Sequence, residues 1–87
     1  MSQEQQANII IAQMCEFVSK QEYCQRLLNE IREGSRQAPS DQIKHLESYV
    51  AEAIQKLTYL AVKCNTILPT KYVVKVKQEV TDYHDKL

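Results

Sequence analysis

Apolar residues recur along the first part of the chain in alternating steps of three and four. The repeat has one polar member, Gln21, and its apolar members are Ala7, Ile10, Met14, Phe17, Cys24, Leu28 and Ile31. This is the a/d spacing of a heptad, which places the apolar positions on one side of an α-helix. Ser2 and Gln5 have the spacing of a capping box, and Gly34 stands where a helix would stop. The pattern predicts a helix over residues 3–33.

A second heptad register follows a short polar stretch. Its members, which no polar residue interrupts, are Ile43, Leu46, Val50, Ala53, Leu57, Leu60, Cys64 and Ile67. Pro69 cannot continue a helix, so we predict a loop over 34–40 and a helix over 41–67, with Ser40 or Asp41 as its N-cap. A loop this short folds two long amphipathic helices back on each other. We therefore expect an antiparallel helical hairpin.

The last segment, residues 70–86, has a weaker pattern. Its apolar members, again three and four apart, are Val73, Val76, Val80, Tyr83 and Leu87. The run Val74-Lys75-Val76-Lys77 also alternates like a strand, but a single strand would have no partner in a helical chain. The sequence thus favours a third helix. Valine side chains lose rotamer freedom in a helix, and the lysines precede the acidic residues, which is the reverse of what the helix dipole favours. The isolated helix should therefore be unstable, and we expect it to form by packing against the hairpin.

The predicted third helix is too short to cover the whole hairpin. At about 1.5 Å per residue, its ~18 residues reach about half-way along a helix of some thirty. It starts at the open end, where we expect it to cover Ile9, Ile11, Tyr59 and Val62. The half next to the loop keeps only two helices. We predict that partners bind there, on a loop-proximal seam that consists of Leu27, Ile31, Leu46, Tyr49 and Val50.

Composition and charge narrow the range of functions. The 87 residues suffice for one domain, and a single Gly with two Pro leaves few tight turns, which fits a few long helices. Eleven Lys plus Arg balance eleven Asp plus Glu, so the surplus positive charge that phosphate binding uses is absent. No apolar run approaches the ~20 residues of a membrane span, and the start lacks signal-peptide character. We expect a cytoplasmic or nuclear protein.

Side chains that could catalyse a reaction or bind a metal are few and poorly spaced. The soft metal ligands are Cys15, Cys24, Cys64, His45 and His84, and none forms a C-x-x-C or H-x-x-x-H pair. Three irregularly spaced cysteines also do not make a disulfide framework. Cys24 and Cys64 occupy heptad positions and should be buried, whereas Cys15 should react sooner. We expect neither an enzyme nor a bound metal or cofactor.

Two polar features leave alternatives open. Gln21 at a core position either fixes the register of the helices or lies at a wet edge of the seam. The lysines of the 71–77 stretch, Lys71, Lys75 and Lys77, either form a solvated face or touch a phosphate backbone.

The leading hypothesis is a non-enzymatic helical interaction module, a subunit or adaptor of a larger assembly. Helices of other chains, in a homo-oligomer or a hetero-complex, would pack onto the exposed heptad seam. A free-standing three-helix bundle that regulates membrane traffic is a variant of this hypothesis. The alternative is a small helical nucleic-acid-binding protein that uses the Lys71–Lys77 stretch.

Overall fold

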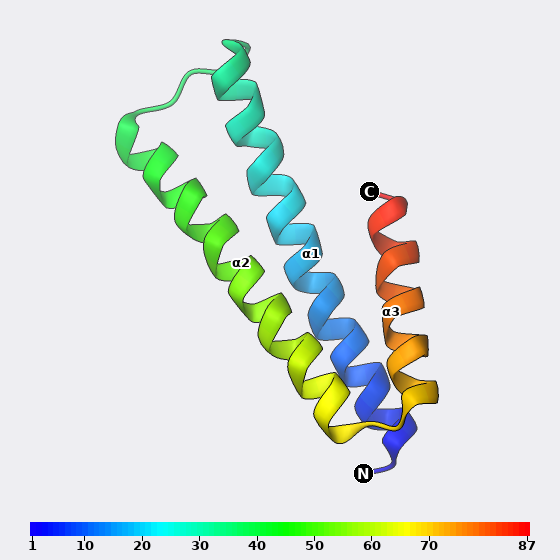
Figure 1. Ribbon diagram of the computed structural model, residues 1–87. Helices are drawn as coiled ribbons and strands as arrows, with labels where there is room; N and C mark the ends of the chain where they lie inside the picture. Colours follow the sequence, from blue (N-terminus) through cyan, green and yellow to red (C-terminus); the bar gives the residue numbers. More distant parts are fainter.

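The computed structural model describes residues 1–87 and consists of three helices and no strand. Helix α1 spans Gln3–Glu33, α2 spans Ser40–Ile67 and α3 spans Thr70–Asp85. Helices α1 and α2 lie antiparallel, and α3 runs back parallel to α1, on which it packs (Figure 1). The molecule is elongated, with principal extents of 47 × 23 × 16 Å. The predicted all-α hairpin with a shorter third helix is confirmed, and the valine-rich tail is helical.

The two ends of α1 have the predicted caps. The Ser2 hydroxyl accepts a hydrogen bond from the backbone N–H of Gln5 at 3.1 Å, and the Gln5 side chain accepts one from the backbone N–H of Ser2 at 2.9 Å. The helix stops at Gly34, whose φ of 83° lies in the left-handed region that glycine adopts without strain. These caps fix where α1 begins and where the chain turns toward α2.

The start of α2 differs from the prediction. Pro39 is the N-cap, and neither Ser40 nor Asp41 makes a capping hydrogen bond with its side chain. The proline has a ψ of 153°, and its carbonyl accepts the N–H of Ile43, so the helix begins one residue earlier than expected. Asp41 lies instead in the first turn, where a carboxylate interacts favourably with the helix dipole.

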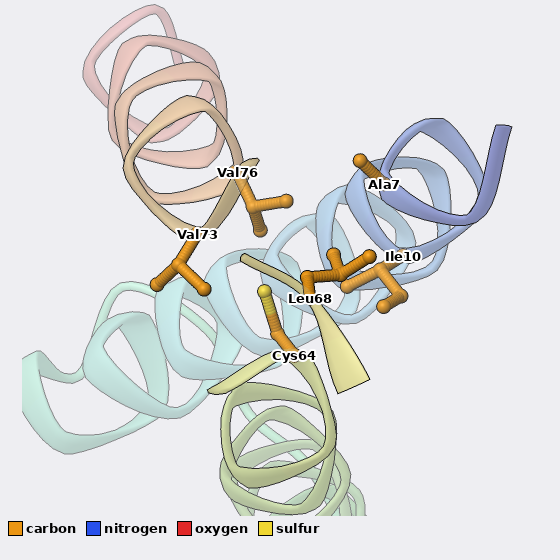
Figure 2. Close-up of a cluster of buried hydrophobic side chains, with 6 residues drawn as sticks. All are labelled: Ala7, Ile10, Cys64, Leu68, Val73 and Val76. Atoms are coloured by element: carbon orange, nitrogen blue, oxygen red, sulfur yellow. The ribbon is translucent and has the colours of Figure 1, made fainter. Parts of the chain in front are cut away.

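Two clusters of buried apolar side chains hold the helices together. The cluster at the open end joins all three helices and contains Ala7, Ile10, Cys64, Leu68, Val73 and Val76 (Figure 2). The cluster near the loop joins α1 and α2 only; it contains Cys24, Leu28 and Leu46, with Leu27, Ile31, Ile43 and Val50 packed against it. No polar side chain is buried. Packing, rather than buried polar contacts, therefore holds α3 in place.

The side of the hairpin on which α3 packs follows from the residues that flank the a/d seam. The a positions begin at Ala7 and Ile43, the d positions begin at Ile10 and Leu46, and each recurs every seven residues. In an antiparallel hairpin, the positions that follow each d residue lie on one side, and those that precede each a residue lie on the other. On the first side the flanking residues at the open end are apolar: Ile11, Val18, Ala61 and Leu68. On the second side they are mostly polar: Gln6, Gln13, Lys20, Leu27, Gln42, Tyr49, Lys56 and Lys63. We call this second row of eight residues the lysine side.

Helix α3 occupies the apolar side. Leu68 belongs to the open-end cluster and Ile11 packs against it. Val18 lines one hollow with Val80 of α3. Polar contacts with α1 add to this packing: Ser19 hydrogen-bonds Tyr83, and Glu22 contacts His84. Burial of valines against apolar neighbours removes more apolar surface from water than packing beside lysines would, which explains the choice of side.

The expected cover of the open end is only partly correct. Ile11 does pack against the open-end cluster, but Ile9, Tyr59 and Val62 remain 44%, 63% and 59% exposed. Ile9 lies away from α3, in a hollow with Ile67 of α2. Tyr59 and Val62 lie on the part of α2 that faces away from α1, because each is displaced by more than a quarter turn from the buried Leu60. Helix α3 thus covers one side of the hairpin only.

Paired valine substitutions on α3 test this packing. Val76 is 1% exposed and Val74 is 59% exposed, so Val76→Ala should lower the free energy of unfolding by about 2 kcal/mol, whereas Val74→Ala should leave it nearly unchanged. Denaturant titration followed by far-UV circular dichroism measures both. Equal effects of the two substitutions would contradict the docking of α3 on this face.

Candidate interaction surface

Helix α3 ends well before it reaches the predicted partner-binding residues. Its last hydrogen-bonded contact with α1 joins His84 Nε2 to Glu22 Oε1 at 2.7 Å. Figure 1 shows the C-terminus beside the middle of α1, while the half of the hairpin next to the loop has no third helix. The loop-proximal seam therefore lies in a two-helix section, as the short length of the third helix predicted.

The residues of the seam differ in exposure. Leu46 is buried, Leu27, Ile31 and Val50 are half-buried, and Tyr49 is 42% exposed. Two interdigitated helices thus shield Leu46 without any lid, and this residue offers no surface to a partner. The accessible part of the seam is a narrow strip that consists of the Tyr49 ring and the edges of the three half-buried side chains.

Tyr49 sits where α1 and α2 meet. The Lys20 ammonium of α1 lies 4.9 Å from the centroid of the Tyr49 ring, and the His45 ring is stacked on it with centroids 6.5 Å apart. An exposed cation–π contact contributes about 0.5–1 kcal/mol. An accessible, amphipathic tyrosine ring is the type of residue that protein interfaces favour.

One shared hollow and one contact place the lysine side of α1 and that of α2 next to each other. At the open end, Gln13 and Lys63 line one hollow together with Ile9, Ile10 and Ile67. Nearer the loop, Lys20 contacts Tyr49. The hairpin therefore has a continuous surface opposite α3, and sequence reasoning missed it because it followed only the a/d positions.

Three lysines on this surface have no ionic partner. Lys20, Lys56 and Lys63 are exposed, and no carboxylate oxygen lies within 4.0 Å of any of their ammonium groups. The ion pairs of the chain lie elsewhere: Arg36 with Glu30, Lys75 with Glu4 and His84 with Glu22. The lysine side is therefore locally cationic in a chain whose net charge is zero.

Lys71 and Lys75, four residues apart, share one face of α3, whereas Lys77 is displaced from Lys75 by about half a turn. Lys75 lies beside α1, 3.4 Å from the Asn8 side chain and 4.0 Å from Glu4. Lys71 folds over the ring of Tyr72, with 4.9 Å between its ammonium and the ring centroid. Lys77 is close enough to Cys64 of α2 to affect its pKa. The three ammonium groups are therefore not gathered on one face of α3.

Gln21 lies at a solvent-accessible edge of the seam. It is half-buried and lines a hollow between α1 and α3 with Val18, Val80 and His84. It makes no hydrogen bond within the protein, and no buried side-chain nitrogen or oxygen lacks a partner, so its amide is open to solvent. This placement supports the solvated interpretation over a role in fixing the register.

The three cysteines have different environments. Cys24 and Cys64 are buried, and Cys15 is half-buried in a hollow that Glu79 and Tyr83 also line. Burial raises the pKa of the Cys15 thiol, and the negative charge of Glu79 raises it further. Burial also raises the pKa of Cys64, an effect that Lys77 partly offsets. Nowhere do three or more His, Cys, Asp or Glu residues gather in an arrangement that could hold a metal ion.

No protein-family model, curated protein or solved structure matches the chain. None of the three helices combines the length and hydrophobicity needed to cross a membrane.

Thiol labelling tests the environments of the cysteines. Cys15 should react with a thiol reagent before Cys24 and Cys64 under native conditions, because only Cys15 is partly accessible. Glu79→Gln should speed the labelling of Cys15 at mildly alkaline pH, because loss of the negative charge lowers the pKa and increases the thiolate fraction. Asp85→Asn is a matched control outside the hollow. Mass spectrometry follows each thiol, and simultaneous labelling of all three would contradict the packing described.

Proposed function

We propose that this chain is a non-enzymatic interaction module, a subunit or adaptor of a cytoplasmic or nuclear assembly. A helix from another chain packs on the two-helix half of the hairpin, over the accessible strip around Tyr49. The interaction completes a bundle, in which apolar side chains of the partner fit between those of α1 and α2.

The difference between the two halves of the hairpin carries this proposal. Where three helices meet, the heptad residues Ile10 and Cys64 are each 2% exposed. Where only two helices meet, Leu28 and Leu46 are also buried, but Ile31 and Val50, at comparable heptad positions, stay half-buried. A partner helix would do at the loop end what α3 does at the open end, and would remove this residual apolar surface from water.

The small core supports the same interpretation. Only 12 of the 87 residues are buried, and a domain of this length is near the lower limit at which one core suffices. The large apolar side chains that remain at least two-fifths exposed are Met1, Ile9, Tyr23, Tyr49, Ile54, Tyr59, Val62, Ile67, Val74 and Leu87. A chain that buries few residues and exposes many large apolar side chains gains stability when a partner covers part of its surface.

A charged double substitution tests the proposal. Tyr49→Glu with Leu27→Glu should abolish assembly with a co-purified partner or with a second copy, because two carboxylates would have to be desolvated in the interface. Val62→Glu with Val74→Glu is the matched control, since both valines are 59% exposed and lie outside the seam. Sedimentation velocity measures assembly, and far-UV circular dichroism verifies helicity.

Assembly of the double variant at the parent level would contradict the proposal. If Leu27→Glu unfolds the protein, Tyr49→Glu alone decides the question, because Tyr49 is exposed enough for a carboxylate to reach solvent.

A further inference from the structure

The lysine side of the hairpin has a charge pattern that the loop-proximal seam does not explain. On α2, Tyr49, Lys56 and Lys63 are seven residues apart, and on α1 the same spacing joins Lys20 to its neighbours Gln13 and Leu27. Residues seven apart lie on one side of an α-helix. The contacts between Lys20 and Tyr49 and around the hollow that contains Lys63 bring both rows to one surface.

The three lysines remain unpaired although carboxylates are near in sequence. Glu16 precedes Lys20 by four residues and Glu52 precedes Lys56 by four, a spacing that permits ion pairs on a helix. Neither pair comes within 4.0 Å in the structure. The Lys20 ammonium lies over the Tyr49 ring instead. The cationic groups are therefore free to meet an external anion.

Apolar side chains lie at both ends of this cationic stretch. At the open end Ile9 and Ile67 line a hollow with Lys63. Toward the loop are Tyr49 and the half-buried Leu27. Tyr49 and Lys63 are separated by 14 residues, about 21 Å along α2, which is roughly four helical turns. The surface thus has the length of a docked helix, with apolar anchors at its ends and positive charge between them.

We infer that the lysine side binds an acidic amphipathic helix of a partner protein. The apolar residues of that helix cover Ile9, Leu27 and Tyr49, and its Asp or Glu residues pair with the lysines. This inference rests on the proposed function, because it specifies the partner that covers the Tyr49 strip. Ion pairs at such a rim select the partner and its orientation.

A second copy of the chain and a nucleic acid both fit this surface less well. A second copy related by a two-fold axis would bring two sets of Lys20, Lys56 and Lys63 together, and like charges in an isologous contact repel. A nucleic acid could pair its phosphates with the lysines, but it would leave Ile9 and Ile67 without apolar cover. An acidic helix satisfies both the charges and the apolar ends.

Binding of two matched peptides to the full chain tests the inference. Both are helical peptides of about six turns with leucine at the heptad core positions; the flanking positions carry Glu in one and Lys in the other. Fluorescence anisotropy should give a Kd about tenfold lower for the acidic peptide, the effect of three exposed ion pairs. Added salt should reduce this preference.

Two variants of equal net charge locate the effect. Lys20→Glu with Lys56→Glu and Lys63→Glu should reverse the preference, so that the basic peptide binds about tenfold tighter. The control changes three exposed lysines on other surfaces, Lys44→Glu, Lys71→Glu and Lys86→Glu, and should keep the preference for the acidic peptide.

Three results would overturn the inference: equal affinity of the parent chain for both peptides, reversal of the preference in the control variant, or binding of a single-stranded DNA oligonucleotide as tightly as the acidic peptide at the same salt concentration. If the parent shows no acidic preference while Tyr49→Glu with Leu27→Glu still abolishes assembly, the inference fails and the proposed function stands. If that double variant assembles normally, the proposed function itself fails.

Discussion

The heptad seam between α1 and α2 is the constraint on which the rest of the molecule depends. Interdigitation of the a and d side chains fixes the rotation of each helix about its axis. Once that rotation is set, the flanking residues have no choice of side: Ile11 and Leu68 lie together, and Lys20 and Tyr49 lie together opposite them. The position of α3 and the cationic surface both follow from this single packing arrangement.

One side of the hairpin is closed within the chain and the other is left open. On the closed side, Val73 and Val76 complete a cluster with Ala7, Ile10 and Cys64. On the lysine side, polar and cationic residues keep the surface hydrated, and apolar groups are confined to its two ends. The chain thereby covers one side of the hairpin with its own third helix and leaves the lysine side accessible.

The sequence predicted the helices, the hairpin and the reach of α3, because heptad spacing and proline positions are local properties. It did not predict which side α3 occupies, because Ile9 and Ile11 extend the apolar surface of the first helix to both sides of the seam. The flanking residues contain that signal: Val18 lies on one side and Lys20 on the other. Nor did spacing alone show that two helices suffice to bury Leu46, since mutual shielding depends on how side chains interdigitate in three dimensions.

The small share of the core that α3 supplies has a consequence for the order in which the molecule opens. Only two of the twelve buried residues, Val73 and Val76, belong to α3, and its link to α2 is the dipeptide Leu68-Pro69. Elements with few buried contacts open at a lower free energy than the rest of a protein. The amide protons of α3 should therefore exchange with solvent deuterium before those at the centre of the α1–α2 hairpin. Local opening of α3 exposes Ile10 and Ile11 to solvent while the hairpin remains folded.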